Sequence, residues 1–167
     1  MPDDHPAADL YTVDLDAWAH RQAEALRAVG NALHDGDDHP LPLRIIDWNN
    51  LAEEIEALAR KDRRELASRI ANIVEHLTKL EFSRHIPPRA GWIDTIRRER
   101  DEIAEILLDS PSLRQEVPGI LSRRSDAATR RAMDALRQHG ETVTARLGID
   151  YQPNEVLEDW LPAEPPS

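Results

Sequence analysis

The sequence predicts an all-α protein: an antiparallel bundle of about four helices, one of them long and central, followed by a short C-terminal helical turn. Three observations favour this fold class. Apolar residues recur at three- and four-residue steps over several long segments, as they do on amphipathic helices. Aromatic residues are only 4% of the 167 residues, so few runs suit a β-strand. Proline and glycine residues are concentrated between the periodic segments, where they end the predicted helices.

The first predicted helix begins after Asp14, whose carboxylate is a good N-cap, and runs to about Val29. Residues 1–11 before it are predicted to be a disordered lead. The stretch from Gly30 to Leu43 contains two glycines and two prolines and is predicted to be a loop. The inward face of this helix is expected to hold Leu15, Trp18, Gln22, Leu26 and Val29.

The second predicted helix is the longest. Asp47 or Asn50 caps its start, and it runs to Phe82 or Arg84. Pro87 ends it, because proline lacks the N–H and disfavours helix in the preceding residue. Its apolar residues fall within an arc of about 120° on a helical wheel. They are expected to form the buried face: Leu51, Ile55, Leu58, Leu66, Ile70, Ile73, Leu77 and Leu80.

The rest of the chain is predicted to complete one domain over residues 12–162. A third helix is predicted at about 92–108, followed by a turn that Ser110 caps, with Pro111 in the first helical position. After the interruption at Pro118, a fourth helix is predicted at about 119–146. A helical turn at 154–161 and a disordered tail at 163–167 complete the chain.

Composition and charge exclude several classes of function. The net charge is −11 with histidine neutral, and the arginines alternate with acids, so a nucleic-acid partner is not expected. The chain has no cysteine, which excludes disulfides and thiolate metal sites and suits a reducing cytoplasm. The first residues lack the apolar core of a signal peptide, and no apolar run approaches the roughly 18 residues of a membrane span.

Polar residues that lie within or beside the apolar arc of the long helix are the candidate site. Asp62 falls inside the arc, and four others lie at its border or flank. With an arginine of the third helix they form what we call the polar seam: Glu54, Asp62, Glu65, Arg69, His76 and Arg100. By contrast, Glu53 and Glu56 point away from the arc and only oppose the helix dipole.

Arg100 occupies a position that spacing assigns to the core of the third helix, between Ile96 and Ile103. A buried charge needs a partner. We therefore predict that Asp62 or Glu65 meets Arg100 across the bundle. One interpretation of such a pair is structural, since it fixes the helix register; the other is that it belongs to a site.

Metal and nucleophile signatures are weak. A di-metal bundle needs Glu-x-x-His motifs, and the residues three positions before the helical histidines are not glutamate. A looser site from His20, His76 and His139 is an alternative. No cysteine, Gly-x-Ser-x-Gly elbow or phosphate loop is present. Neither a metal site nor a cofactor is therefore predicted.

Other surfaces have two interpretations each. Trp48 and Trp160 either pack on the bundle or anchor a protein partner. The basic stretch "TIRRER" is either a solvated face or an anion site. The small residues Ala128, Ala132 and Ala135 either pack in the core or form a dimer seam.

Several segments together resemble a known family. They are "YTVDLDAWAHRQAEALR", "DWNNLAEEIEALARKDRREL", "HLTKLEF", "GWIDTIRRERDEI" and "LLDSPSLR". In this order they are similar to the bacterial family catalogued as domain of unknown function twenty-nine, over about residues 10–162. The resemblance implies an all-helical fold and makes Glu54 or Glu65 the expected partner of Arg100. It implies no activity, substrate or cofactor. This chain departs from the family pattern at Asp62, where a small polar residue is common.

The function favoured by the sequence is a non-catalytic cytoplasmic module that acts through contacts with an unknown protein partner or with itself. The alternative is a small enzyme or a ligand- or metal-binding bundle that uses the polar seam.

Overall fold

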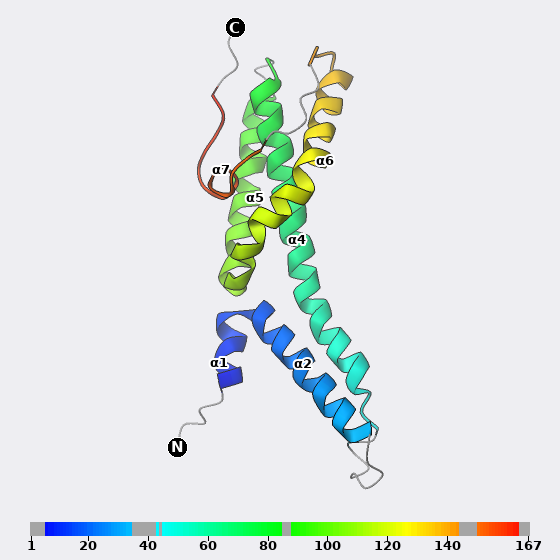
Figure 1. The fold of residues 1–167 in the computed structure, drawn as a ribbon. Coiled ribbons are helices and arrows are strands. Elements are labelled where there is room, and N and C mark those ends of the chain that lie inside the picture. Colours follow the sequence, from blue (N-terminus) through cyan, green and yellow to red (C-terminus); the bar gives the residue numbers. More distant parts are fainter. Residues whose placement is uncertain (1–5, 35–42, 44, 85–87, 144–149, 164–167) are drawn as a thin grey trace. The chain divides into compact units, whose positions relative to one another are not determined.

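The computed structural model describes residues 6–34, 43, 45–84, 88–143 and 150–163, and these residues contain helices and no strand (Figure 1). The prediction of an all-α fold with one long helix is therefore confirmed. The helices are α1 (Pro6–Val13), α2 (Leu15–His34), α4 (Trp48–Phe82), α5 (Arg89–Asp109), the 3₁₀ helix η1 (Pro111–Glu116), α6 (Val117–Gln138) and α7 (Pro153–Leu157).

The chain divides into two compact units. The first comprises Met1–Arg64 with Leu108–Leu113, and the second comprises Glu65–Leu107 with Arg114–Ser167. The helix α4 is continuous across the change from one unit to the other. The single domain over 12–162 stays a prediction.

In the first unit, α2 runs antiparallel to the first part of α4, and we call this pair the hairpin. A Cβ atom at Gly30 would lie only 2.8 Å from the Cβ atom of Trp48. At the other end of the pair, Arg63 binds Asp16 at 3.0 Å. The side chains at the seam between the helices are small and fully buried: Ala19, Ala23, Ala52 and Ala59.

This alanine seam corrects the buried face that was predicted for the start of the long helix. Leu51 is 42% exposed and Leu58 is 49% exposed, although both were expected in the core. The predicted arc is correct further along α4, where Leu66, Ile70, Ile73, Leu77 and Leu80 are buried. The difference arises because α2 approaches α4 on its alanine side, which leaves the larger residues on a flank.

The start of the chain also differs from the prediction. Residues 6–11, placed in a disordered lead, belong to α1. The ring of Tyr11 meets the ring of Trp18 edge-on, with centroids 4.9 Å apart. Asp14 caps α2 as predicted, since its carboxylate accepts a hydrogen bond from the Ala17 N–H at 2.9 Å. It also accepts hydrogen bonds from the N–H and hydroxyl of Ser112, which fix the entry to η1.

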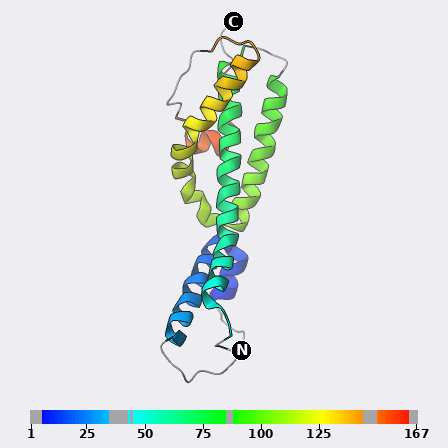
Figure 2. The same cartoon turned by 90° about the vertical axis from the view of Figure 1, so that its right-hand side faces the viewer.

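In the second unit, α5, α6 and the second part of α4 run side by side (Figures 1 and 2). The α6 helix begins at Val117, so the predicted interruption at Pro118 marks the change from η1 to α6. It ends at Gln138, where Gly140 adopts φ 83° and the N–H of Glu141 returns to the carbonyl of Leu136. The predicted continuation to residue 146 is therefore wrong up to residue 143, and the rest lies outside the described residues.

Two remaining predictions can be placed in this unit. Ala128 and Ala132 are fully buried, so their packing interpretation is correct. The terminal helical turn is α7, which is shorter than the predicted 154–161. Among the described residues, no helix carries a stretch apolar and long enough to span a lipid bilayer.

Candidate functional site

Arg69 is the centre of the polar seam in the second unit. Its guanidinium binds Glu65 at 2.7 Å on its own helix, and it binds Glu99 at 3.0 Å and Glu102 at 3.1 Å on α5. The hydrogen bonds with Glu65, followed by those with Glu99, raise the pKa of Arg69. One cation therefore holds three carboxylates, and this cluster joins α4 to α5.

Arg100 does not form the predicted pair with Asp62 or Glu65. Its Nε donates to the carbonyl of Val156 at 3.0 Å, and one Nη donates to the carbonyls of Glu155 at 2.8 Å and Trp160 at 2.7 Å. These acceptors lie in and directly after α7. The buried cation thus fastens the C-terminal turn onto α5. Burial lowers the pKa of Arg100.

The other members of the polar seam do not converge on one point. His76 is half-buried, its Nδ1 is 2.8 Å from the carbonyl oxygen of Asn72, and burial lowers its pKa. Glu54 is exposed and Asp62 is half-buried, and both belong to the first unit. In the part of the chain that the structure describes, no three histidine or carboxylate side chains are grouped to hold a metal ion.

Two contacts were not predicted from the sequence. Glu99, expected on a solvated face, is buried against Arg69. Glu99 lies three residues after Ile96 and four before Ile103, and this helical spacing places it on the buried face of α5. Tyr151, which no motif singled out, is 4% exposed and donates its hydroxyl to Glu81 at 2.9 Å; burial raises its pKa.

One edge of the hairpin is held by ion pairs. Arg27 binds Glu56 with two parallel hydrogen bonds of 2.8 and 2.9 Å, and Arg60 approaches the same carboxylate at 3.2 Å. The expectation that Glu56 only opposes the helix dipole is therefore wrong, because α2 packs on its side of α4 and Arg27 binds it. The hydrogen bonds from Arg27 lower the pKa of Glu56 to about 2.

We expect the hairpin to lose the stabilisation from the Arg27–Glu56 ion pair in acid. The folded-state pKa of Glu56 lies below its ordinary value of 4.5, so the pair stabilises fully above pH 4.5 and is lost as the pH falls toward 2. In urea unfolding followed across this range, the wild type should be more stable than Glu56→Gln near neutral pH and equal to it at the acid end. A stability difference that does not change with pH would contradict this role.

The opposite side of the hairpin is mainly apolar, and the half-buried Asp62 shares it. Among the described residues, every large apolar side chain that is exposed belongs to the first unit: Tyr11, Val13, Val29, Ile45, Ile46, Leu51, Leu58 and Leu108. Three of them, Val29, Leu51 and Leu58, lie along α2 and α4 on the flank away from the ion pairs. We call this flank the hairpin face; it also holds Ala25, Ala32 and Ile55.

Charges of both signs border the hairpin face. Glu54 and Lys61 are exposed and lie seven residues apart on α4, so they share one strip of the helix on either side of Leu58. A surface with this pattern is electrostatically complementary to its own antiparallel copy.

The two tryptophans proposed as anchors both have intramolecular contacts. The indole N–H of Trp48 donates to the carbonyl of Leu43 at 3.1 Å, so Trp48 fastens the residues before α4. Trp160 meets the ring of Tyr151 at 6.2 Å, and its carbonyl receives the bond from Arg100. Trp160 therefore packs onto its own chain.

Comparisons with known proteins agree with this fold. No curated protein matches the chain. A crystal structure of an alpha-helical protein of unknown function from Rhodospirillum rubrum is similar, with a TM-score of 0.70, 24% sequence identity and 89% of each chain covered. That similarity concerns the fold alone. The model of the family described as Domain of unknown function DUF29 matches residues 10–161, nearly the whole chain, and the protein therefore belongs to this family.

Proposed function

We propose that this protein is a non-catalytic cytoplasmic module that acts through protein contacts, and that it associates with a second copy of itself through the hairpin face. The gathering of the exposed large apolar side chains in the first unit carries this proposal. Contiguous apolar surface on a protein marks an interaction site, whereas single exposed leucines need no explanation.

The architecture of the hairpin supports a helical occupant of this face. Two helices bury only the seam between them, and here that seam consists of alanine. Stable helical domains cover the remaining apolar flank with another layer. Two hairpins related by a two-fold axis would supply that layer to each other and form a four-helix bundle.

The charges that border the face support a second copy as the occupant. If α4 meets the α4 of a second copy in antiparallel orientation around Leu58, Glu54 faces the copy's Lys61 and Lys61 faces the copy's Glu54. Both pairs then form by symmetry. Exposed pairs of this kind contribute about 0.2–1 kcal/mol each, so they contribute more to the specificity of the association than to its affinity.

The apolar contact is tested by Leu58→Glu, with Ala104→Glu as its control. Both positions are exposed on helices, and both changes add one negative charge. We expect light scattering and sedimentation to show a dimer for the wild type and the control, and a monomer for Leu58→Glu with an unchanged circular dichroism spectrum. A monomeric wild type at high protein concentration would overturn the proposal.

The same expectation can be tested with charges alone. Glu54→Lys and Lys61→Glu should each weaken self-association, because each places like charges opposite one another. The double variant should associate as the wild type does. When the two single variants are mixed, they should form heterodimers in preference to either homodimer. Equal association of the single and double variants would exclude this antiparallel arrangement.

The polar seam supports a ligand site less well. The donors of Arg69 are directed to three carboxylates, and the Nε and one Nη of Arg100 are directed to backbone carbonyls. These contacts join helices within the second unit, which is a structural role.

A further inference from the structure

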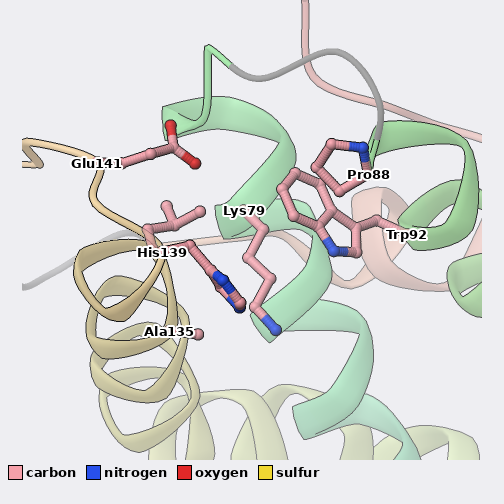
Figure 3. Close-up of a pocket in the computed structure, with 7 residues that line it drawn as sticks. Lys79, Pro88, Trp92, Ala135, His139 and Glu141 are labelled. Atoms are coloured by element: carbon pink, nitrogen blue, oxygen red, sulfur yellow. The ribbon is translucent and has the colours of Figure 1, made fainter.

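A cavity of about 380 Å³ opens in the second unit between the end of α4, the start of α5 and the end of α6 (Figure 3). This volume lies within the range of small-molecule sites. Its lining shares no residue with the hairpin face or the polar seam. Its lining residues are Lys79, Pro88, Trp92, Ala135, Leu136, His139 and Glu141.

The walls of the cavity are apolar and partly aromatic. Trp92 and Pro88 line it from the α5 side, and Ala135 and Leu136 line it from α6. Trp92 and His139 lie on opposite sides of the Lys79 side chain (Figure 3). An indole favours a flat ring as its neighbour, because stacked aromatic pairs gain free energy beyond the area that they bury.

The polar groups of the cavity include the ammonium of Lys79, which has one hydrogen-bond partner among the described residues. The Nζ of Lys79 donates to Glu75 at 2.7 Å, and an ammonium carries three N–H groups. Glu75 is also bound by Arg131 at 2.9 Å, so two cations share one carboxylate. The Lys79 side chain is only 13% exposed.

The carboxylate of Glu141 is already engaged. One oxygen accepts a hydrogen bond from the Ser83 hydroxyl at 2.7 Å, and the other accepts from the Arg84 N–H at 3.1 Å. These bonds fasten the residues after α6 to the end of α4. Glu141 therefore fixes the rim of the cavity, and Lys79 and His139 remain to contact a ligand.

We propose that this cavity binds a small molecule that carries a planar aromatic ring and one carboxylate. The ring lies against Trp92 and the carboxylate accepts hydrogen bonds from Lys79, while the exposed imidazole of His139 contacts the ligand at the mouth. This site is additional to the proposed self-association and does not depend on it.

Titration of the full chain with naphthoate and its neutral amide, naphthamide, tests the proposal by calorimetry and by NMR of the indole N–H groups. We expect naphthoate to bind with a shift of the Trp92 signal. Naphthamide should bind about tenfold to a hundredfold more weakly, since it lacks the charge-assisted hydrogen bond. Equal affinity for acid and amide, absence of binding or an unmoved Trp92 signal would overturn the proposal.

Variants assign the preference for the acid to one side chain. Lys79→Met should remove the difference between naphthoate and naphthamide, and Arg97→Met, which removes a positive charge from an exposed side chain outside the cavity, should keep it. If Lys79→Met does not fold, the comparison of acid and amide on the wild type decides. A peptide ending in phenylalanine presents the same two groups, so tighter binding of that peptide than of phenylacetate would overturn the small-molecule assignment.

Discussion

Arg100→Met should lower the free energy of unfolding by about 2–4 kcal/mol, because hydrogen bonds from a charged donor contribute more than neutral ones. For a chain of this size the loss corresponds to a decrease in Tm of about 5–15 °C. The side chain is buried, and its guanidinium satisfies the carbonyls of Glu155, Val156 and Trp160. Methionine keeps the apolar stem but leaves these three acceptors without their donor.

Thermal unfolding and the NMR signal of the Trp160 indole measure this effect. The signal should move toward the position of a solvated tryptophan, because α7 loses its attachment to α5. Arg97→Met is the control: it removes the same group from a side chain that is 61% exposed and 4.0 Å from Asp94. If Arg100→Met melted at the temperature of this control, the fastening role of Arg100 would be wrong.

Arg69→Met should destabilise the second unit by a similar amount at neutral pH, about 2–4 kcal/mol. Removing one partner of a buried ion pair leaves its charge uncompensated, and this costs more than an exposed pair contributes. Here the side chain of Glu99 is 9% exposed, and Glu65 and Glu102 lie beside the same guanidinium. The variant leaves three carboxylates together without the guanidinium that they share.

A double-mutant cycle separates this mechanism from lost packing. The double variant with Glu99→Gln should recover part of the loss of stability that Arg69→Met causes, and the cycle quantifies this coupling. Arg98→Met is the control, because Arg98 is exposed and lies 3.8 Å from the same Glu99. A loss of stability that is independent of Glu99 would contradict the electrostatic explanation.

The helices could be predicted from the periodicity of their apolar residues and from the capping, proline and glycine residues at their ends. Asp14 and Asp47 mark two helix starts, and each accepts the capping hydrogen bond that its position implies. The long helix follows because nothing interrupts its apolar repeat. The end of α6 was predicted too late, since the signal at Gly140 is one glycine whose positive φ becomes evident only in the structure.

The polar contacts were harder to predict, for two physical reasons. The buried face of a helix is predicted mainly from its leucine and isoleucine residues, so the burial of Ala52 and Ala59 was not predicted. These two small side chains allow α2 to approach α4 closely. The helical wheel therefore placed Leu58 in the core, where the structure leaves it 49% exposed, and it gave no sign of the ion pair between Glu56 and Arg27. The partners of Arg100 are backbone carbonyls, and a carbonyl carries no side-chain signal in a sequence.

The alanine seam also determines where the chain opens most easily. A buried alanine removes less carbon from water than a buried leucine or isoleucine, so each turn of the hairpin gains less free energy on folding. The same helix, α4, buries Leu66, Ile70 and Ile73 once it enters the second unit. Local opening should therefore cost little in the first part of this one continuous helix and much in the second. The hairpin is therefore the segment in which a bound partner would suppress local opening the most.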